Sequence, residues 1–202
     1  MPRALGQIDE QKSEDILRAA IDLFAQKGPK ASMAEIARQA GVSKQTLYNR
    51  YPSKSDLARA LLTMRSMAIT APLEDDADAV AALTAVAEAL LDRINRPQST
   101  DHLRALALVS REDGELATAV YEAGPGRSLD RIADWLKIQN TRGVLTIDDA
   151  DEAAEVFIGM VQGHAHLRLV LNMPPLAGRD VKSHAREAAK RFVRAYAPVS
   201  DR

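Results

Sequence analysis

The sequence contains no cysteine and few aromatic residues. Of its 202 residues, phenylalanine, tryptophan and tyrosine together account for 4%. The lack of cysteine excludes a disulfide framework, a thiol nucleophile and a thiolate metal site. No apolar run approaches the roughly 18–20 residues that span a membrane. Residues 1–12 carry Asp9 and Glu10 and no apolar core, so we expect no secretory signal and a cytoplasmic location.

Helical periodicity dominates the chain, and no stretch shows a convincing strand-like alternation. Glycine and proline divide the sequence into about nine predicted helices. Their ranges are 9–27, 33–40, 44–50, 54–71, 76–95, 100–112, 114–122 continuing at 127–141, 148–172 and 179–196. The sequence therefore predicts an all-α protein.

Charge is divided unevenly along the chain. Residues 25–65 contain eight Lys and Arg against two Asp and Glu, whereas residues 66–202 contain 16 against 21. A basic front on an acidic body indicates an anionic partner for the front. A solvated helical surface would show the same excess.

Residues 32–50 have the pattern of a helix-turn-helix. Ala37 is small, as the close crossing of two short helices requires, and Gly41 tolerates the positive φ of the turn. A capping box at 32–35 opens the first helix, and Ser43 can cap the second. Leu47 is placed to pin the second helix onto the first.

Six polar or amphipathic side chains of the second helix remain for its outward positions, although not all of them lie on one face. A helix in the major groove of DNA needs such donors, acceptors and cations for base edges and phosphates. A short exposed helix in a bundle is the alternative. The side chains are Lys44, Gln45, Thr46, Tyr48, Asn49 and Arg50.

The run IARQAGVSKQTLYNRYPSKSDL, residues 36–57, resembles the TetR family of transcriptional regulators. Its Ile-Ala, Ala-Gly-Val-Ser, Thr-Leu-Tyr and Ser-Lys-x-x-Leu elements follow the family's order and spacing. Tyr51 stands where the family often has Phe or Trp, and the pair Ala31-Ser32 stands where a Thr pair is common. The resemblance implies a three-helix DNA-binding domain over residues 1–53.

The resemblance also implies residue roles. Ser32, Tyr48 and Lys54 match phosphate-contacting positions, although the Tyr48 ring could instead pack beneath the helix. Lys44, Gln45, Thr46 and Arg50 are candidate readers of bases or backbone. The predicted DNA-binding set is Ser32, Ser43, Lys44, Gln45, Thr46, Tyr48, Asn49, Arg50, Tyr51 and Lys54.

Residues 103–161 resemble the C-terminal domain of AefR-like members of this family, through YEAGP at 121–125, GVL at 143–145 and FIG at 157–159. This implies a helical ligand-binding and dimerisation domain over residues 54–202, and it names no ligand. Each candidate pocket residue could equally belong to the core. These candidates are Met64, Met67, Leu90, Leu106, Tyr121 and Trp135.

The predicted helices 148–172 and 179–196 are apolar over wide faces. One protomer is not expected to cover both faces, which predicts a four-helix interface in a homodimer. Gly159 and Gly163 would permit close approach there, or make room for a pocket. The candidate interface residues are Phe157, Met160, Val161, His164, Leu167, Ala188 and Phe192.

No pattern of catalytic or metal-binding residues occurs. His164 and His166 are two positions apart, which on a helix places them on different faces. Helix capping explains the acidic residues at 148–152. We therefore expect no enzyme, cofactor, metal or membrane partner.

The sequence as a whole predicts a homodimeric repressor that leaves a palindromic operator in double-stranded DNA when an unknown small molecule binds. A small-molecule enzyme and a module whose helix-turn-helix binds protein are the rival functions. Whether the chain represses or activates stays open.

Overall fold

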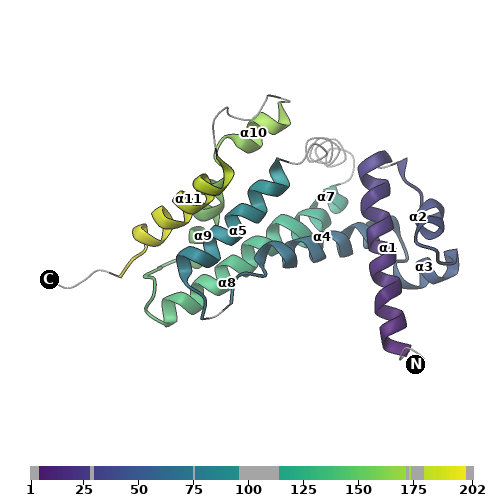
Figure 1. The fold of residues 1–202 in the computed structure, drawn as a ribbon, viewed down its shortest axis with the longest axis horizontal. Coiled ribbons are helices and arrows are strands. Elements are labelled where there is room, and N and C mark those ends of the chain that lie inside the picture. Colours follow the sequence, from purple (N-terminus) through teal and green to yellow (C-terminus); the bar gives the residue numbers. More distant parts are fainter. Residues whose placement is uncertain are drawn as a thin grey trace. The chain divides into compact units, whose positions relative to one another are not determined.

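The computed structural model describes residues 5–27, 30–74, 76–95, 114–171, 173 and 180–198. Across these ranges the regular structure is helical and contains no strand, as the sequence predicts. The N-terminal helices are α1 (Leu5–Lys27), α2 (Met33–Gln39), α3 (Lys44–Arg50) and α4 (Lys54–Thr70). The later helices are α5 (Ala79–Ile94), α7 (Gly114–Tyr121), α8 (Arg127–Thr141), α9 (Ala150–Gln162), α10 (Ala165–Val170) and α11 (Val181–Ala195) (Figure 1).

The helices form two compact units. We call α1–α3 with residues 54–64 of α4 the head, and α5 and α8–α11 with residues 65–70 of α4 the body; α7 is grouped with the head. Residues of α4 belong to both units. The sequence-based domain boundary between residues 53 and 54 stays a prediction.

The head has a small apolar core of its own. Ile16 and Leu23 from α1, Ile36 from α2, Leu47 from α3 and Leu57 from α4 are all buried in it. Burying one such side chain contributes about 1.5–3 kcal/mol. This shared core therefore fixes α1, α2, α3 and the first part of α4 against one another.

Capping hydrogen bonds and the backbone angle of the turn confirm the predicted helix-turn-helix. The Ser32 hydroxyl accepts from the Glu35 amide at 3.3 Å, and the Glu35 carboxylate accepts from the Ser32 amide at 3.0 Å. Gly41 has φ +67°, a conformation that other residues rarely adopt. The Ser43 hydroxyl then caps α3 by accepting from the Thr46 amide at 3.0 Å.

The body has a larger core, in which α5 packs against α11 and α9 packs against α8 (Figure 1). Its centre contains two buried aromatic rings, Phe157 on α9 and Phe192 on α11, whose centroids are 5.3 Å apart in an edge-to-face arrangement. Such a pair contributes about 0.5–1.5 kcal/mol beyond its area burial.

Two predicted helices differ from the structure. The range 148–172 is not one helix, because Gly163 has φ +48° and ψ −135° and ends α9 before α10 begins. The Gly163 amide donates to the Gly159 carbonyl, which closes the last turn of α9. The predicted break at residues 124–126 is instead a π-helical turn, Glu122–Gly126, that leads directly into α8. The predicted helix 100–112 lies outside the described residues.

Candidate nucleic-acid interface

The outward face of α3 consists of four exposed side chains. Lys44, Gln45, Tyr48 and Asn49 are exposed, whereas Leu47 is fully buried on the opposite side. These four occupy positions i, i+1, i+4 and i+5, which share one side of a helix. The structure therefore gathers two amides, a cation and a phenol on a single surface of α3.

The other two polar residues of α3 are partly buried and bonded within the head. The Arg50 guanidinium donates to the Ser13 hydroxyl on α1, and the hydroxyls of Thr46 and Ser43 are 2.8 Å apart. These contacts fix the C-terminal end of α3 to α1 and its N-terminal end to its own cap. The sequence offered no signal for Ser13, which lies 37 positions before Arg50.

The two amides on the exposed face are hydrogen-bonded to each other. Gln45 Nε2 donates to Asn49 Oδ1 at 2.7 Å, one helical turn away. This bond uses one of the two N–H groups of Gln45 and leaves its oxygen exposed to solvent. The face of α3 therefore carries an ordered amide pair rather than two independent side chains.

Candidate phosphate contacts flank α3. Lys54 is half-buried at the first position of α4, and Ser53 caps this helix by accepting from the Asp56 amide at 3.1 Å. Tyr51 packs partly buried against the head core. The first turn of α4 thus combines a lysine with backbone amides that favour an anion.

The carboxylate of Glu35 is neutralised within this basic region. Lys27 Nζ lies 2.5 Å from Glu35 Oε1. The hydrogen bond from Lys27, helped by those from the backbone and hydroxyl of Ser32, lowers the pKa of Glu35 from 4.5 to about 2. The Ser32 hydroxyl is itself 2.9 Å from Glu35 Oε2, so a phosphate would have to share it with this capping box.

The candidate pocket residues fall into two groups. Leu90 and Trp135 are buried, and Trp135 Nε1 donates to the Glu74 carbonyl at 2.8 Å. Met64, Met67 and Tyr121 are exposed. Leu106 lies outside the described residues.

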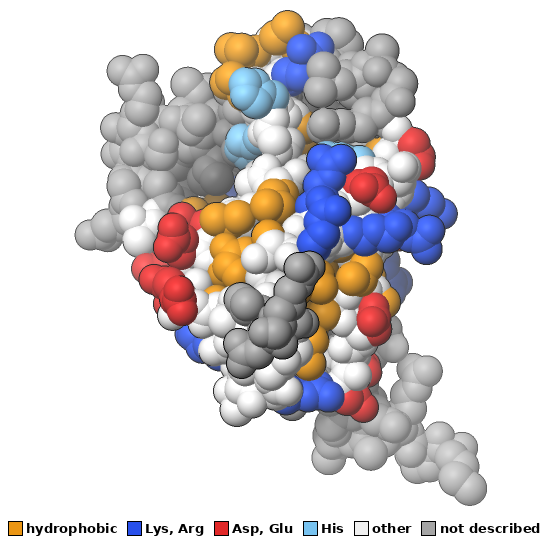
Figure 2. Space-filling view, turned by 90° about the vertical axis from the view of Figure 1, so that its left-hand side faces the viewer, with side chains coloured by type: hydrophobic (Ala, Val, Ile, Leu, Met, Phe, Trp, Pro, Cys, Tyr) orange, Lys and Arg blue, Asp and Glu red, His pale blue; other side chains and the backbone are white. Residues whose placement is uncertain are grey.

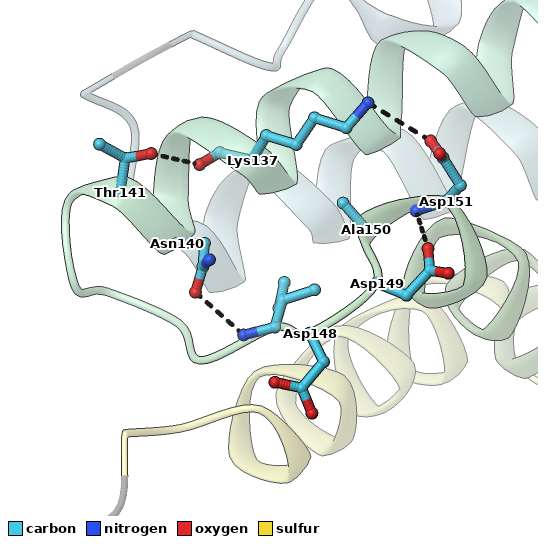
Figure 3. Close-up of a pocket in the computed structure, with 8 residues that line it drawn as sticks. Lys137, Asn140, Thr141, Asp148, Asp149, Ala150 and Asp151 are labelled. Atoms are coloured by element: carbon cyan, nitrogen blue, oxygen red, sulfur yellow. Dashed lines mark hydrogen bonds and ion pairs between the residues drawn. The ribbon is translucent and has the colours of Figure 1, made fainter.

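A depression of about 360 Å³ lies where α8 turns into α9, and none of the candidate pocket residues lines it (Figure 3). Its lining is polar. Lys137 Nζ lies 3.3 Å from Asp134 and 3.4 Å from Asp151, and the two carboxylates raise the pKa of Lys137. Asp149 caps α9, accepting from the Asp151 amide at 2.9 Å. Capping thus engages Asp149, and ion pairing, which the sequence did not predict, engages Asp151.

A buried polar cluster that the sequence did not reveal lies between α4 and α8. Ser128 Oγ donates to Ser66 Oγ at 2.9 Å, and Arg131 Nε donates to Thr70 Oγ1 at 2.6 Å. Ser66, Thr70 and Ser128 are all buried. These hydrogen bonds fix the register of the last turns of α4 against α8.

The candidate interface residues separate into core and surface. Phe157, Val161, Ala188 and Phe192 are buried within the protomer itself, so their side chains belong to its core. Met160, His164 and Leu167 are exposed. Met160 and Leu167, together with three further exposed apolar residues, define a surface that we call the apolar stripe: Val156, Met160, Leu167, Leu171 and Met173.

Charged side chains border hydrophobic ones on the surface of the body in Figure 2. On α9 the exposed acidic residues are Asp151, Glu152 and Glu155. On α11 the exposed residues are mostly basic: Lys182, Arg186, Lys190, Arg191 and Arg194, with Glu187. The two helices therefore carry opposite charge on their solvent-facing sides.

Two further properties concern the described residues only. None of their helices has both the length and the apolar character to cross a membrane. No three His, Asp or Glu side chains in these ranges come together as ligands for a metal ion.

Family models match most of the chain. The model described as "Bacterial regulatory proteins, tetR family" matches residues 16–61, which include all of α2 and α3. The model described as "AefR-like transcriptional repressor, C-terminal domain" matches residues 81–198.

Individual proteins agree with these models. The chain is 27% identical over 165 residues to the HTH-type transcriptional regulator SrpR of Pseudomonas putida, covering 81% of this chain and 78% of that protein. A putative TetR-family regulator from Mesorhizobium loti has the same fold, with a TM-score of 0.72 at 23% identity over 94% of this chain and 98% of that one. The flavonoid-responsive regulator FrrA matches with a TM-score of 0.66 at 31% identity, over the same shares of the two chains. From the helix-turn-helix, the family models and these relatives, we conclude that the chain belongs to the TetR family of transcriptional regulators.

Proposed function

We propose that this chain is a homodimeric, ligand-responsive repressor that binds a palindromic operator through α3 of each subunit. The family's members are DNA-binding transcriptional repressors. The observation that carries the proposal for this chain is the exposed polar face of α3, which stands on a buried Leu47 and follows a capped turn. A helix presented in this way fits the major groove, where donors and acceptors on base edges are accessible.

The proposed partner in the dimer is a second copy of the chain, packed on the apolar stripe. Five large apolar side chains exposed within residues 156–173 favour an interaction site. A two-fold axis through the stripe would bring the acidic side of α9 in one copy towards the basic side of α11 in the other. The same contact would form a second time with the two copies exchanged. The two-fold axis makes the operator a palindrome.

The proposed response to a small molecule resides in the body. The name of FrrA states a response to flavonoids, and this supports a small-molecule effector here without identifying it. Met67, Leu90 and Trp135 remain the proposed lining within the body. α4 supplies Leu57 and Leu61 to the head core and Ile69 to the body core, so a shift of this helix would affect both. The effector can lower DNA affinity at most by the ratio of its own affinities for two conformations of the protein, the one released from DNA and the one bound to DNA.

The test is a selection of bound duplexes from a random-sequence DNA pool, together with light scattering of the free protein. We expect a dimer of 22.0 kDa chains and enrichment of a palindrome. The affinity for that palindrome should fall steeply with salt, because lysine and arginine release counterions from the phosphates. A folded dimer that enriches no sequence at low salt, with or without a library of small molecules, would contradict the proposal.

A further inference from the structure

The contacts within the head restrict which side chains of α3 can read a base. Arg50 is engaged with Ser13 on α1, and Thr46 is engaged with the Ser43 cap. The exposed side chains are Lys44, Gln45, Tyr48 and Asn49. Of these, only Gln45 and Asn49 combine a donor and an acceptor in one planar group, which distinguishes one base edge from another.

The bond between the two amides determines what Gln45 offers to a base. Gln45 Nε2 donates one hydrogen to Asn49 Oδ1 at 2.7 Å, which leaves Oε1 as an acceptor and the second N–H as a donor. A rotated Gln45 amide would place its oxygen against the Asn49 oxygen and lose this bond. The bond to Asn49 therefore holds the Gln45 side chain in place and reduces the rotamer freedom that binding would otherwise have to remove.

An acceptor beside a donor matches one purine edge in the major groove. Adenine presents N7 as an acceptor and N6–H₂ as a donor, whereas guanine presents two acceptors, N7 and O6. The oxygen of Gln45 would face an acceptor on guanine and a donor on adenine. We propose that Gln45 reads an adenine in each operator half-site and that Asn49 positions Gln45 for this contact. This inference rests on the proposed docking of α3 in the major groove.

The experiment compares base preferences rather than affinity alone. Wild-type protein and the variants Gln45→Ala, Gln45→Glu, Asn49→Ala and Asn49→Asp are each selected on the random pool. Each is then measured against the enriched operator with every base at the responsive position. For the wild type, we expect replacement of one adenine per half-site by guanine to weaken binding roughly tenfold to a hundredfold. Replacement of that adenine by 7-deazaadenine, which lacks the N7 acceptor, should also weaken binding.

Each variant has a distinct expected result. Gln45→Ala should remove the preference at that position and keep the rest of the motif. Gln45→Glu should move the preference to cytosine, because a carboxylate accepts from cytosine N4. Asn49→Ala should weaken the adenine preference, and Asn49→Asp should restore it relative to Asn49→Ala, since aspartate keeps the acceptor for Gln45 Nε2. A purely structural role of Asn49 would not move a base preference.

Lys44→Ala is the matched control, because Lys44 is an exposed neighbour of Gln45 on the same helix. It should weaken binding to all duplexes about evenly and reduce the salt slope by about 1. If wild type and Gln45→Ala, both folded and dimeric, enrich the same palindrome with the same base preferences, the reading of adenine by Gln45 is wrong while the proposed function stands. If the wild-type dimer enriches nothing, the proposed function fails and the inference fails with it.

Discussion

In the head, α3 exposes polar side chains, whereas the apolar stripe of the body exposes hydrophobic ones. In the head, α3 buries Leu47 and presents amides, a lysine and a tyrosine to solvent. In the body, α9 buries Phe157 and Val161, and α9, α10 and the residues directly after α10 present the apolar stripe. In the proposed function, the exposed side of each helix matches its partner. The polar face of α3 meets a charged, hydrated duplex, and the apolar stripe meets a second copy of the chain.

The strongest test of this comparison removes the buried anchor of each surface. Leu47→Ala should lower the free energy of unfolding by about 2–5 kcal/mol, and Phe157→Ala by about 3–5 kcal/mol, since both residues are fully buried. Urea denaturation measures both. Leu47→Ala should lose operator binding and remain a dimer, whereas Phe157→Ala should lose the dimer as well. Wild-type operator affinity in Leu47→Ala would show that α3 need not be anchored.

A charge placed on the apolar stripe should separate the subunits. Met160 is 38% exposed, and Met160→Asp would leave an unpaired carboxylate in the proposed interface. We expect light scattering to report monomers at micromolar concentration and operator affinity to fall. Val144→Asp is the control, because Val144 is 40% exposed on the loop between α8 and α9, outside the stripe. Dimers of both variants would remove the stripe from the proposed interface.

The hydrogen bond between the two buried serines of the body should contribute to the free energy of unfolding. Ser128→Ala removes the partner of the buried Ser66 hydroxyl and should cost about 1–3 kcal/mol of unfolding free energy. The double variant Ser66→Ala with Ser128→Ala should cost less than the sum of the two single changes, because it leaves neither hydroxyl without its partner. Strict additivity in urea denaturation would mean that the two hydroxyls do not support each other.

Two basic residues of the head should affect DNA binding in different ways. Lys54→Ala should weaken binding about evenly across sequences and reduce the salt slope by about 1, as loss of a phosphate contact does. Arg50→Ala removes the contact with Ser13 that holds the end of α3. It should therefore weaken binding to the operator more than binding to random duplexes. Fluorescence titrations at several salt concentrations distinguish the two, and unchanged affinity in both variants would refute their placement.

The smallest expected effect concerns the ion pair of Glu35. The folded state lowers the pKa of Glu35 from 4.5 to about 2, so folding favours the ionised carboxylate. Its stabilising contribution is present above about pH 4.5 and is lost as the pH falls towards 2. Wild type and Glu35→Gln should therefore differ slightly in melting temperature above pH 4.5 and converge below it. A difference that grows on acidification would contradict the assigned shift.

The helix-turn-helix could be predicted because its determinants are local. Ser32, Gly41, Ser43 and Leu47 act on residues within one or two turns of themselves, and the rules for caps and turns apply directly. The engagement of Arg50 within the head was not local. It depends on Ser13, a residue of another helix, and no spacing in the sequence connects the two residues.

The body could be predicted only in outline. The periodicity showed apolar faces but not which apolar residues one protomer covers, so Phe157 and Met160 looked alike although one is buried and the other exposed. A glycine such as Gly163 costs only about 1 kcal/mol inside a helix, so its presence alone did not reveal that the backbone turns there. The contact between Ser66 and Ser128 spans 62 positions and had no sequence signal.

The fixed position of α3 has a kinetic consequence. The Ser43 cap, the buried Leu47 and the bond from Arg50 to Ser13 order this helix in the protein without DNA. An encounter with a duplex therefore requires no folding step before the bases are tested. The association rate should be limited by diffusion and charge attraction, and a dimer sliding along non-specific DNA can test each register with the same rigid surface.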